Sequence, residues 1–292
     1  MMKSLNYFSN SLLILGLLTC GYNNYALAGD RLLATGGITE IEGAGGGGLT
    51  PWALITGYGT DKQVGASAFY TKARTRGGYE LDIGGVAVGV NNRFEVSLSQ
   101  TKFGLSNTVP NESIKLNTVG LKVRVFGDAI YDQDEWLPQL ALGAQFKQNE
   151  DFDLVPKLIG AEHSSGIDYY ASATKLYLGA IDGRSLLLNA TLQATKANQF
   201  GILGFGGDKN NNYRIEPAFS GAVMLTDNLL TGVEYRYKPN NIKVFEEDDA
   251  KDVFITWFPH KNISVTGAYV DLGNIANKDN QSAWYFSGQV SY

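Results

Sequence analysis

The sequence predicts an all-β protein, a transmembrane up-and-down antiparallel β-barrel of about 14 strands, with 12 as the alternative. Polar and apolar residues alternate along most of the chain, which is the period of a strand with two different faces. Most runs reach or exceed the roughly 9 to 11 residues of a tilted membrane strand, whereas strands of soluble sandwiches average about 5 or 6. Short and long connections follow one another, which is typical of short periplasmic turns and longer extracellular loops.

The first 28 residues predict a signal peptide that is cleaved on export. Lys3 precedes the apolar run 12–18, and the small residues Ala26 and Ala28 are spaced for cleavage. The run is well short of the roughly 20 residues that span a bilayer as a helix. Cys20 follows the run closely, so lipidation of this cysteine stays open as an alternative.

Composition excludes several classes of function. Cys20 is the only cysteine, so the mature chain has neither disulfides nor a catalytic thiolate. The formal net charge of −5 becomes −6 once Lys3 leaves with the signal peptide, and a negative chain argues against a nucleic-acid partner. After residue 28 no apolar stretch is long enough for a membrane helix, so the chain is either soluble or crosses a bilayer as strands.

Each expected barrel strand is a run of alternation bounded by turn residues. Within residues 185–195, for example, Leu186, Leu188 and Leu192 share one face, and Asn189 and Gln193 share the other. Asn, Asp and Gly occupy several of the tight links, where they favour turns. The expected strands are 51–59, 64–75, 78–90, 93–103, 114–126, 137–147, 167–179, 185–196, 213–225, 229–238, 251–258, 262–272 and 283–292.

The glycine-rich segment 29–50 admits two interpretations. These thirteen runs are an odd number, and bacterial barrels have even numbers of strands, so residues 36–44 are expected as one more strand. Alternatively the whole segment folds into the lumen as a plug and leaves a barrel of 12 strands. The expected organisation is therefore a signal peptide (1–28), this segment (29–50) and a β-barrel (51–292).

The C-terminal strand is expected to seal the barrel against the first strand. Its apolar face consists of Trp284, Phe286, Gly288, Val290 and Tyr292, and we expect this face to contact lipid. A terminal aromatic residue on such a strand resembles the signal that the barrel assembly machinery binds.

All four tryptophans occur at the ends of expected strands. They are Trp52, Trp136, Trp257 and Trp284. Indole rings favour the headgroup region of a membrane, so this placement favours a membrane barrel over a soluble sandwich.

Charged residues occupy the face opposite the lipid in several runs. Lys122 and Arg124, for example, alternate with Leu121 and Val123. Charges on a buried face require water or opposite charges around them, so they are expected to line a lumen. The expected lumen-lining residues are Glu80, Asp82, Glu95, Lys122, Arg124, Arg214, Glu216, Glu234, Arg236 and Lys238.

Three long segments resemble one family of exported proteins. They are LLATGGITEIEGAGGGGLTPWALITGYGT (32–60), LLLNATLQATKANQFGILGFGGD (186–208) and KDVFITWFPHKNISVTGAYVDLGNIANK (251–278). They are similar to the Gram-negative proteins grouped as domain of unknown function 3034, and the likeness covers nearly the whole mature chain. The resemblance implies an outer-membrane location and supplies neither a reaction nor binding residues.

Motifs for catalysis, cofactors and metals are weak. Gly43, Gly45 and Gly48 match a dinucleotide-binding pattern, but a strand is expected where that motif needs a helix. The acidic stretches 132–135 and 246–252 lack the spacing of a calcium loop, so no metal or cofactor is expected. His163 and His260 are expected on opposite rims and cannot cooperate in acid–base catalysis, so the sequence does not predict an enzyme.

The function that this sequence predicts is a passive, porin-like channel for small hydrophilic solutes in the Gram-negative outer membrane. A barrel of 12 to 14 strands is wider than the eight-stranded kind that side chains fill. The alternative is a non-conducting scaffold or surface-binding protein, because the charges could pair across the lumen and close it. The expected partners are outer-membrane lipid and lipopolysaccharide, the barrel assembly machinery and small solutes, without nucleic acid.

Overall fold

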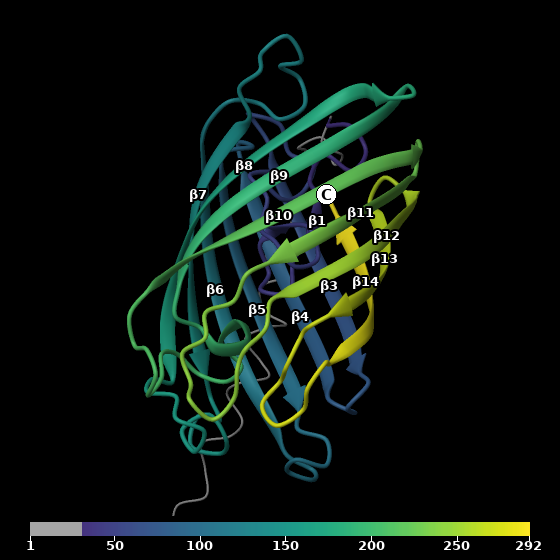
Figure 1. The fold of residues 1–292 in the computed structure, drawn as a ribbon. Coiled ribbons are helices and arrows are strands. Elements are labelled where there is room, and N and C mark those ends of the chain that lie inside the picture. The colour runs from purple at the N-terminus through teal and green to yellow at the C-terminus, as the bar shows by residue number, and fades with distance from the viewer. Residues whose placement is uncertain (1–30) are drawn as a thin grey trace, which may run out of the picture.

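The computed structural model describes residues 31–292, which form a closed barrel of twelve antiparallel strands, β3 to β14 (Figure 1). Each strand pairs with the next one in the chain, and β14 pairs with β3 to close the barrel. The predicted up-and-down barrel is confirmed, with the lower of the two strand counts. The predicted signal peptide and Cys20 lie outside the described residues.

The strand bounds follow the predicted runs closely from residue 64 onward. They are β3 (Val64–Thr75), β4 (Glu80–Val90), β5 (Phe94–Gly104), β6 (Ser113–Phe126), β7 (Gln139–Asn149), β8 (Ser165–Ile181), β9 (Arg184–Thr195), β10 (Arg214–Thr226), β11 (Leu229–Arg236), β12 (Ala250–His260), β13 (Ile263–Asp271) and β14 (Ser282–Ser291).

The outer face of the barrel is apolar. In β5, Phe94, Val96 and Leu98 are exposed on the outside, while Glu95 and Ser97 are buried inside. Such alternation is the pattern of strands with lipid on one side and a polar interior on the other. Within residues 31–292, no helix is long and apolar enough to cross a membrane. Other exposed apolar residues are Val86, Val119, Leu121, Leu142, Phe146, Leu188, Leu192, Phe219, Val233, Val253, Ile255, Val265 and Phe286.

The two ends of the barrel differ. At one end, which we call the turn end, residues 182–183, 227–228 and 261–262 are two-residue turns. Asp182 and Gly183 both have positive φ (47° and 79°), as a hairpin turn that matches the strand twist requires. At the opposite end, the loop end, connections reach 15 residues or more, as in 150–164 and 196–213 (lower part of Figure 1).

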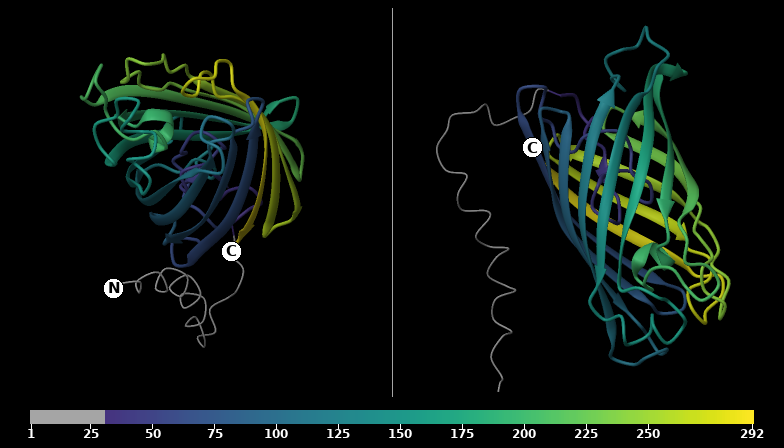
Figure 2. Two further views of the ribbon diagram at one scale, coloured as in Figure 1. Left: turned by 90° about the horizontal axis from the view of Figure 1, so that it is seen from below. Right: turned by 90° about the vertical axis from the view of Figure 1, so that its left-hand side faces the viewer.

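The N-terminal segment lies inside the barrel as a plug, which we define as residues 31–59 (Figure 2, left). Its only regular structure is a two-stranded ribbon of β1 (Ile38–Thr39) and β2 (Gly45–Gly46). Nearly all of its residues are buried. Of the two predicted arrangements of the N-terminal segment, the lumen plug is therefore the one observed.

Two sequence expectations for this region are wrong. Residues 36–44 and 51–59 are not barrel strands, and the barrel begins at Val64 instead of residue 51. Trp52 is accordingly not at a membrane rim but buried in the lumen, where its Nε1 donates to Ser220 Oγ at 2.9 Å. The physical reason is that the hydrogen bonds of this segment go to wall side chains, so a local two-residue period does not imply a strand here.

The barrel seam ends at the last residue. Tyr292 N donates to Ala66 O at 2.8 Å, and Tyr292 O accepts from Ala66 N at 2.9 Å and from Tyr58 N at 2.8 Å. The C-terminal residue therefore joins the first barrel strand to the exit of the plug. The side chains of Trp284, Phe286, Val290 and Tyr292 are exposed on the outside.

Deleting Tyr292 should lower the amount of assembled barrel several-fold, because the deletion removes two seam hydrogen bonds, one bond to the plug and the terminal outward aromatic ring. The measurement is the fraction of protein that migrates as folded barrel in unheated gel samples. Tyr292→Phe is the matched control and should assemble normally. Normal assembly of the deletion variant would contradict this role of the terminus.

Candidate functional site: the latched lumen

Wall side chains bind the main chain of the plug across the middle of the lumen. We call the hydrogen bonds and ion pairs between plug residues 40–56 and the inward side chains of the barrel the latch. Some backbone groups of the plug bond to one another, as Ile41 N does to Gly48 O, but with so little regular structure the other buried N–H and C=O groups need partners from elsewhere. The latch supplies these partners.

Two wall carboxylates accept hydrogen bonds from the plug backbone. Glu234 on β11 accepts from Gly48 N at 2.5 Å and Leu49 N at 2.7 Å. Glu95 on β5 accepts from Gly45 N at 2.9 Å and Thr56 N at 2.8 Å. Both carboxylates are almost fully buried. Without the plug or water, Glu95 would keep only its ion pair with Lys122 and Glu234 only its bond from Ser220 Oγ, so part of each buried carboxylate would be left without hydrogen bonds.

Two wall cations bind plug carbonyl groups. Lys122 on β6 donates to Gly45 O at 2.7 Å and Leu54 O at 3.0 Å, and its Nζ lies 3.1 Å from a carboxylate oxygen of Glu95. Arg236 on β11 donates to Leu49 O at 2.8 Å. The plug backbone is therefore bound through both its donors and its acceptors.

The plug also contributes two carboxylates of its own. Glu42 forms ion pairs with Lys147 and with Arg236, the latter at 2.8 Å, and Lys147 in turn lies 2.5 Å from Asp168. Glu40 accepts from Gln145 Nε2 at 2.6 Å, and its Oε2 lies 3.7 Å from Arg236 Nη1. A chain of alternating charges thus crosses the lumen from β7 and β8 to β11.

The two plug carboxyl groups are held in different protonation states. Burial, reinforced by the negative charge of Glu42, raises the pKa of Glu40 to about 8. Burial would also raise the pKa of Glu42, but Arg236 and Lys147 outweigh it and hold that pKa below its ordinary value. Near neutral pH, Glu40 is therefore largely neutral and Glu42 is ionised.

Uncharged side chains complete the latch on the opposite wall. Ser172 and Thr191 donate to Pro51 O at 3.0 and 2.8 Å. Gln139 Nε2 donates to Ala53 O at 2.5 Å. The middle of the plug is therefore anchored to β7, β8 and β9 as well as to β5, β6 and β11.

The run of glycines is explained by these close contacts. A Cβ atom at Gly47 would lie 2.0 Å from Glu234 Oε1, and one at Gly48 would lie 2.0 Å from Tyr285 Oη. Both distances are far below van der Waals contact, so any larger residue would displace the plug or the wall. The glycines serve close approach of a carboxylate and a phenol, not a phosphate.

One connection at the loop end folds into the lumen and lies on the loop side of the plug. This inward loop (residues 197–206) contains the 3-10 turn η1 (Asn198–Gly201), in which Gln199 and Phe200 have positive φ. The Phe200 ring lies 4.7 Å from the Arg236 guanidinium. Asn149 Nδ2 donates to Ile202 O at 2.7 Å and Glu247 accepts from Gln199 N at 2.7 Å, so the strained loop is anchored in place.

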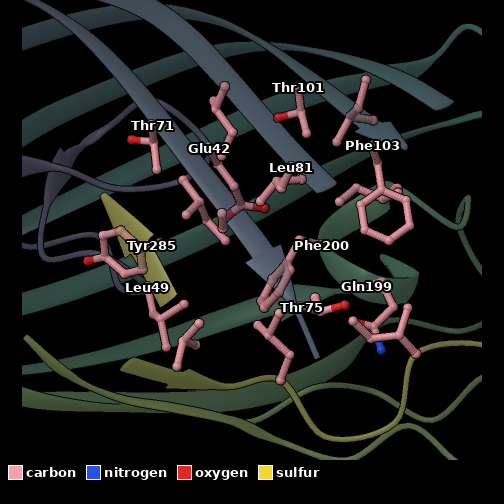
Figure 3. A pocket seen from close by; sticks show the side chains of 18 of the residues that line it. Glu42, Leu49, Thr71, Thr75, Leu81, Thr101, Phe103, Gln199, Phe200 and Tyr285 are labelled. Carbon is pink, nitrogen blue, oxygen red and sulfur yellow. The ribbon is translucent and has the colours of Figure 1, made fainter. Parts of the chain in front are cut away.

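Little free space remains between the plug and the inward loop. A cavity of about 50 Å³ lies between plug residue Leu49 and Phe200, lined also by Leu81, Phe103 and Tyr285 (Figure 3). Its exposed lining is mostly apolar, and its volume is small compared with that of a ligand site. The inward loop therefore lies close to this part of the plug.

Eight of the ten residues predicted to line the lumen do point inward, and most have partners. Arg124 lies 3.3 Å from both Asp61 and Asp128, and Lys238 Nζ lies 3.9 Å from Glu247. Arg214 and Glu216 face inward near the loop end, where they are more accessible. The eight are Glu95, Lys122, Arg124, Arg214, Glu216, Glu234, Arg236 and Lys238.

Glu80 and Asp82 do not line the lumen, and this expectation is wrong. They share the outward face of β4 with Val86 and pair with β3, Asp82 with Lys72 at 3.1 Å and Glu80 with Arg74 at 3.6 Å. The apolar face of β4 changes sides at Gly84 and Gly85. Leu81 and Ile83 point inward there because the lumen is apolar at the loop end.

Sequence analysis missed several members of the latch. Two carboxylates spaced two apart in the glycine-rich segment, Glu40 and Glu42, were a usable signal, because buried carboxylates there require wall cations. Lys147 and Asp168 alternate with the outward residues Phe146 and Tyr169, which is the same signal as for Lys122. Asp252 lies directly opposite Glu234 on β12, and neither of its carboxylate oxygens has a hydrogen-bond partner within residues 31–292.

Other sequence motifs remain apart in the structure. His163 lies next to β8 at the loop end and His260 ends β12 at the turn end, so the two are at opposite ends of the barrel. Over the part of the chain that the structure describes, no group of three or more His, Cys, Asp or Glu side chains is arranged to hold a metal ion.

Comparison with known families gives one match. The model of the family described as "Protein of unknown function (DUF3034)" matches residues 35–289. No curated protein matches the sequence.

Several solved barrels share the general shape at low identity. The NanC porin is 10% identical with a TM-score of 0.49, and 77% of this chain covers 98% of it. The KdgM porin is 11% identical with a TM-score of 0.45, and 77% of this chain covers 99% of it. Omp33 of Acinetobacter baumannii is 9% identical with a TM-score of 0.45, and 80% of this chain covers all of it. Similarity at this level transfers no function.

Replacing Gly47 with Ala should loosen the plug, because the new Cβ would overlap the Glu234 carboxylate. A cysteine introduced at Leu54, which is buried in the wild type, should react at least tenfold faster with a water-soluble thiol reagent in the Gly47→Ala background. Gly288→Ala is the matched control, since a Cβ there meets nothing within 4 Å. Equal labelling rates in both backgrounds would contradict the latch.

The latch should weaken as pH rises, because the pKa of Glu40 is higher in the docked plug than in a released one. The stabilisation is fully present below the ordinary value of 4.5 and is lost as pH rises through about 8. The emission maximum of Trp52, in a variant with the other three tryptophans changed to Phe, should shift to the red across this range. Glu40→Gln should remove most of the shift, and an unchanged profile in this variant would contradict the assignment.

Proposed function

The chain belongs to the DUF3034 family, and we propose that it is an outer-membrane channel for small hydrophilic solutes that its own plug closes at rest. The observation that carries this proposal is the latch itself. The wall residues that bind the plug, together with the neighbouring Asp168 and Asp252, form a polar belt around the middle of the lumen, and this belt would line an aqueous pore once the plug moved. Its charged members are Glu95, Lys122, Lys147, Asp168, Glu234, Arg236 and Asp252.

The width of the barrel supports a pore. An eight-stranded barrel is filled by its own side chains, whereas the twelve strands here enclose a whole polypeptide segment as well. Removing that segment would leave space that the wall side chains do not fill. Since the wall there is charged, water would occupy the space.

The chemistry of the latch supports a movable plug. Hydrogen bonds to the plug can be replaced by bonds to water, so the net free energy of each is only about 0.5–1.5 kcal/mol, or about 1.5–3 kcal/mol where one partner is charged. A continuous apolar interface would cost about 25 cal/mol for each Å² that separation exposes. A polar latch therefore releases a segment more easily than an apolar core of the same size.

The outer face supports a location in the Gram-negative outer membrane. Its apolar band matches a barrel in lipid. Because the number of strands is even, the start of β3 and the end of β14 both lie at the turn end. Outward cations near the loop end, including Lys72 and Arg74, lie where they could contact the phosphates of lipopolysaccharide. The outward C-terminal strand fits assembly by the barrel machinery.

The second candidate is a non-conducting scaffold or surface-binding protein, which the many bonds between the plug and the wall favour. In that case the latch is permanent and the partners bind the loop end. We propose no enzymatic role, because the two histidines are at opposite ends of the barrel.

In a planar bilayer, the purified wild type should conduct only in rare openings, because the plug crosses the middle of the lumen. A variant that lacks residues 31–56 should conduct persistently. Gly47→Ala should open more often than the wild type, with Gly288→Ala as its control. A deletion variant that assembles but does not conduct would favour the scaffold.

Ion preference tests whether the polar belt lines the pore. In the variant without the plug, Lys122→Glu combined with Arg124→Glu should shift the preference toward cations. Lys72→Glu combined with Arg74→Glu makes the same change of charge on the outer face and should have a much smaller effect. Equal shifts from the two pairs would contradict a pore lined by the belt.

A further inference from the structure

A second cavity lies on the turn side of the plug, and its wall is mainly apolar where the polar belt is charged. Its volume is about 440 Å³, compared with about 50 Å³ for the cavity beneath the inward loop. It lies between the start of the plug and the inner wall of β8 to β12. We call it the turn-end chamber.

The interior of the chamber is lined mainly by apolar side chains. From the wall come Leu187, Met224, Leu230 and Phe258 on β9, β10, β11 and β12, and from the plug come Trp52 and Leu54. All four wall residues point into the lumen on strands whose outward face is also apolar. Strands around a water-filled lumen have a polar inward face, whereas these strands are apolar on both their inward and their outward faces.

The wall residues that line the chamber form none of the hydrogen bonds of the latch. Leu187 and Leu230 lie toward the turn end from Asn189 and Gly232 on their strands, and the charged belt begins only at Glu234. If the chamber served only as a water pathway, this apolar zone would be a dewetted barrier at its entrance. A ligand with an apolar surface accounts for it better.

The mouth of the chamber is polar. Arg184 and Ser185 at the start of β9, and Thr226 and Asp227 at the β10–β11 turn, lie at its edge. Arg184 is exposed and forms no ion pair among residues 31–292. The chamber therefore combines a deep apolar interior with a hydrated rim.

We propose that the turn-end chamber is a binding site for a small single-chain amphiphile, whose hydrocarbon tail packs among Leu54, Leu187, Leu230 and Phe258 while its polar end stays at the mouth. Its volume is within the roughly 300–1,000 Å³ of small-molecule sites, and such sites are mostly apolar with a few polar groups. An apolar cavity binds an apolar guest in preference to water. The proposal goes beyond the channel function and does not depend on conduction.

Trp52 provides the measurement, because its ring lines the chamber. The outward or loop tryptophans are changed to Phe (Trp136→Phe, Trp257→Phe and Trp284→Phe), and the full-length protein is placed in lipid nanodiscs. Dodecanoate that carries bromine near its methyl end quenches indole fluorescence on contact. We expect saturable quenching of Trp52, which unbrominated dodecanoate competes away.

Two variants separate binding in the chamber from partition into the surrounding lipid. Leu187→Asn places an amide in the chamber and should weaken binding at least tenfold, whereas Leu188→Asn changes the next residue, which faces outward, and should leave binding unchanged. Folded migration of both variants in unheated gels shows that they assemble. Quenching that never saturates, or that is the same in both variants, would overturn the proposal.

Discussion

The rest of the structure depends on one constraint, which is that a polypeptide without regular structure lies inside a barrel and must satisfy its backbone there. Buried N–H and C=O groups that find no partner cost free energy comparable to a lost hydrogen bond. Wall side chains meet this need, with Glu234 and Glu95 for donors and Lys122 and Arg236 for carbonyl groups. The inward charges are therefore as much a consequence of the plug as of any solute.

The same constraint explains the composition of the plug. Wall carboxylates and a phenol approach its main chain so closely that Gly47 and Gly48 leave no room for a Cβ. Its own carboxylates complete a network with Lys147 and Arg236. Buried ion pairs of this kind are weak contributors to stability but strongly disfavour the loss of a single partner. Such a network therefore favours one docked position of the plug. If the whole plug left, water could replace all of these bonds together.

The lumen is asymmetric along its axis, and each zone supports a different role. The loop end is narrowed by apolar packing around Phe103 and by the inward loop, which carries Phe205. The middle is polar and holds the plug, and the turn end opens into the apolar chamber. A solute that entered from the turn end would therefore meet the chamber first and the latch second.

The sequence alone determined the barrel, its lipid face and most of its strands, because these depend on a two-residue alternation that is local in the chain. The strand ends from Val64 onward, the outward face of β14 and the inward direction of eight of the ten charges predicted to line the lumen follow from it. Only the tertiary structure decided between fourteen and twelve strands, because the local pattern of the plug resembles a strand while its partners are distant, as with Gly48 and Glu234, which are 186 residues apart. It also decided on which side Glu80 and Asp82 lie. The apolar residues of β4 move from the outward to the inward face where the lumen becomes apolar, and the local pattern cannot show what lies across a barrel.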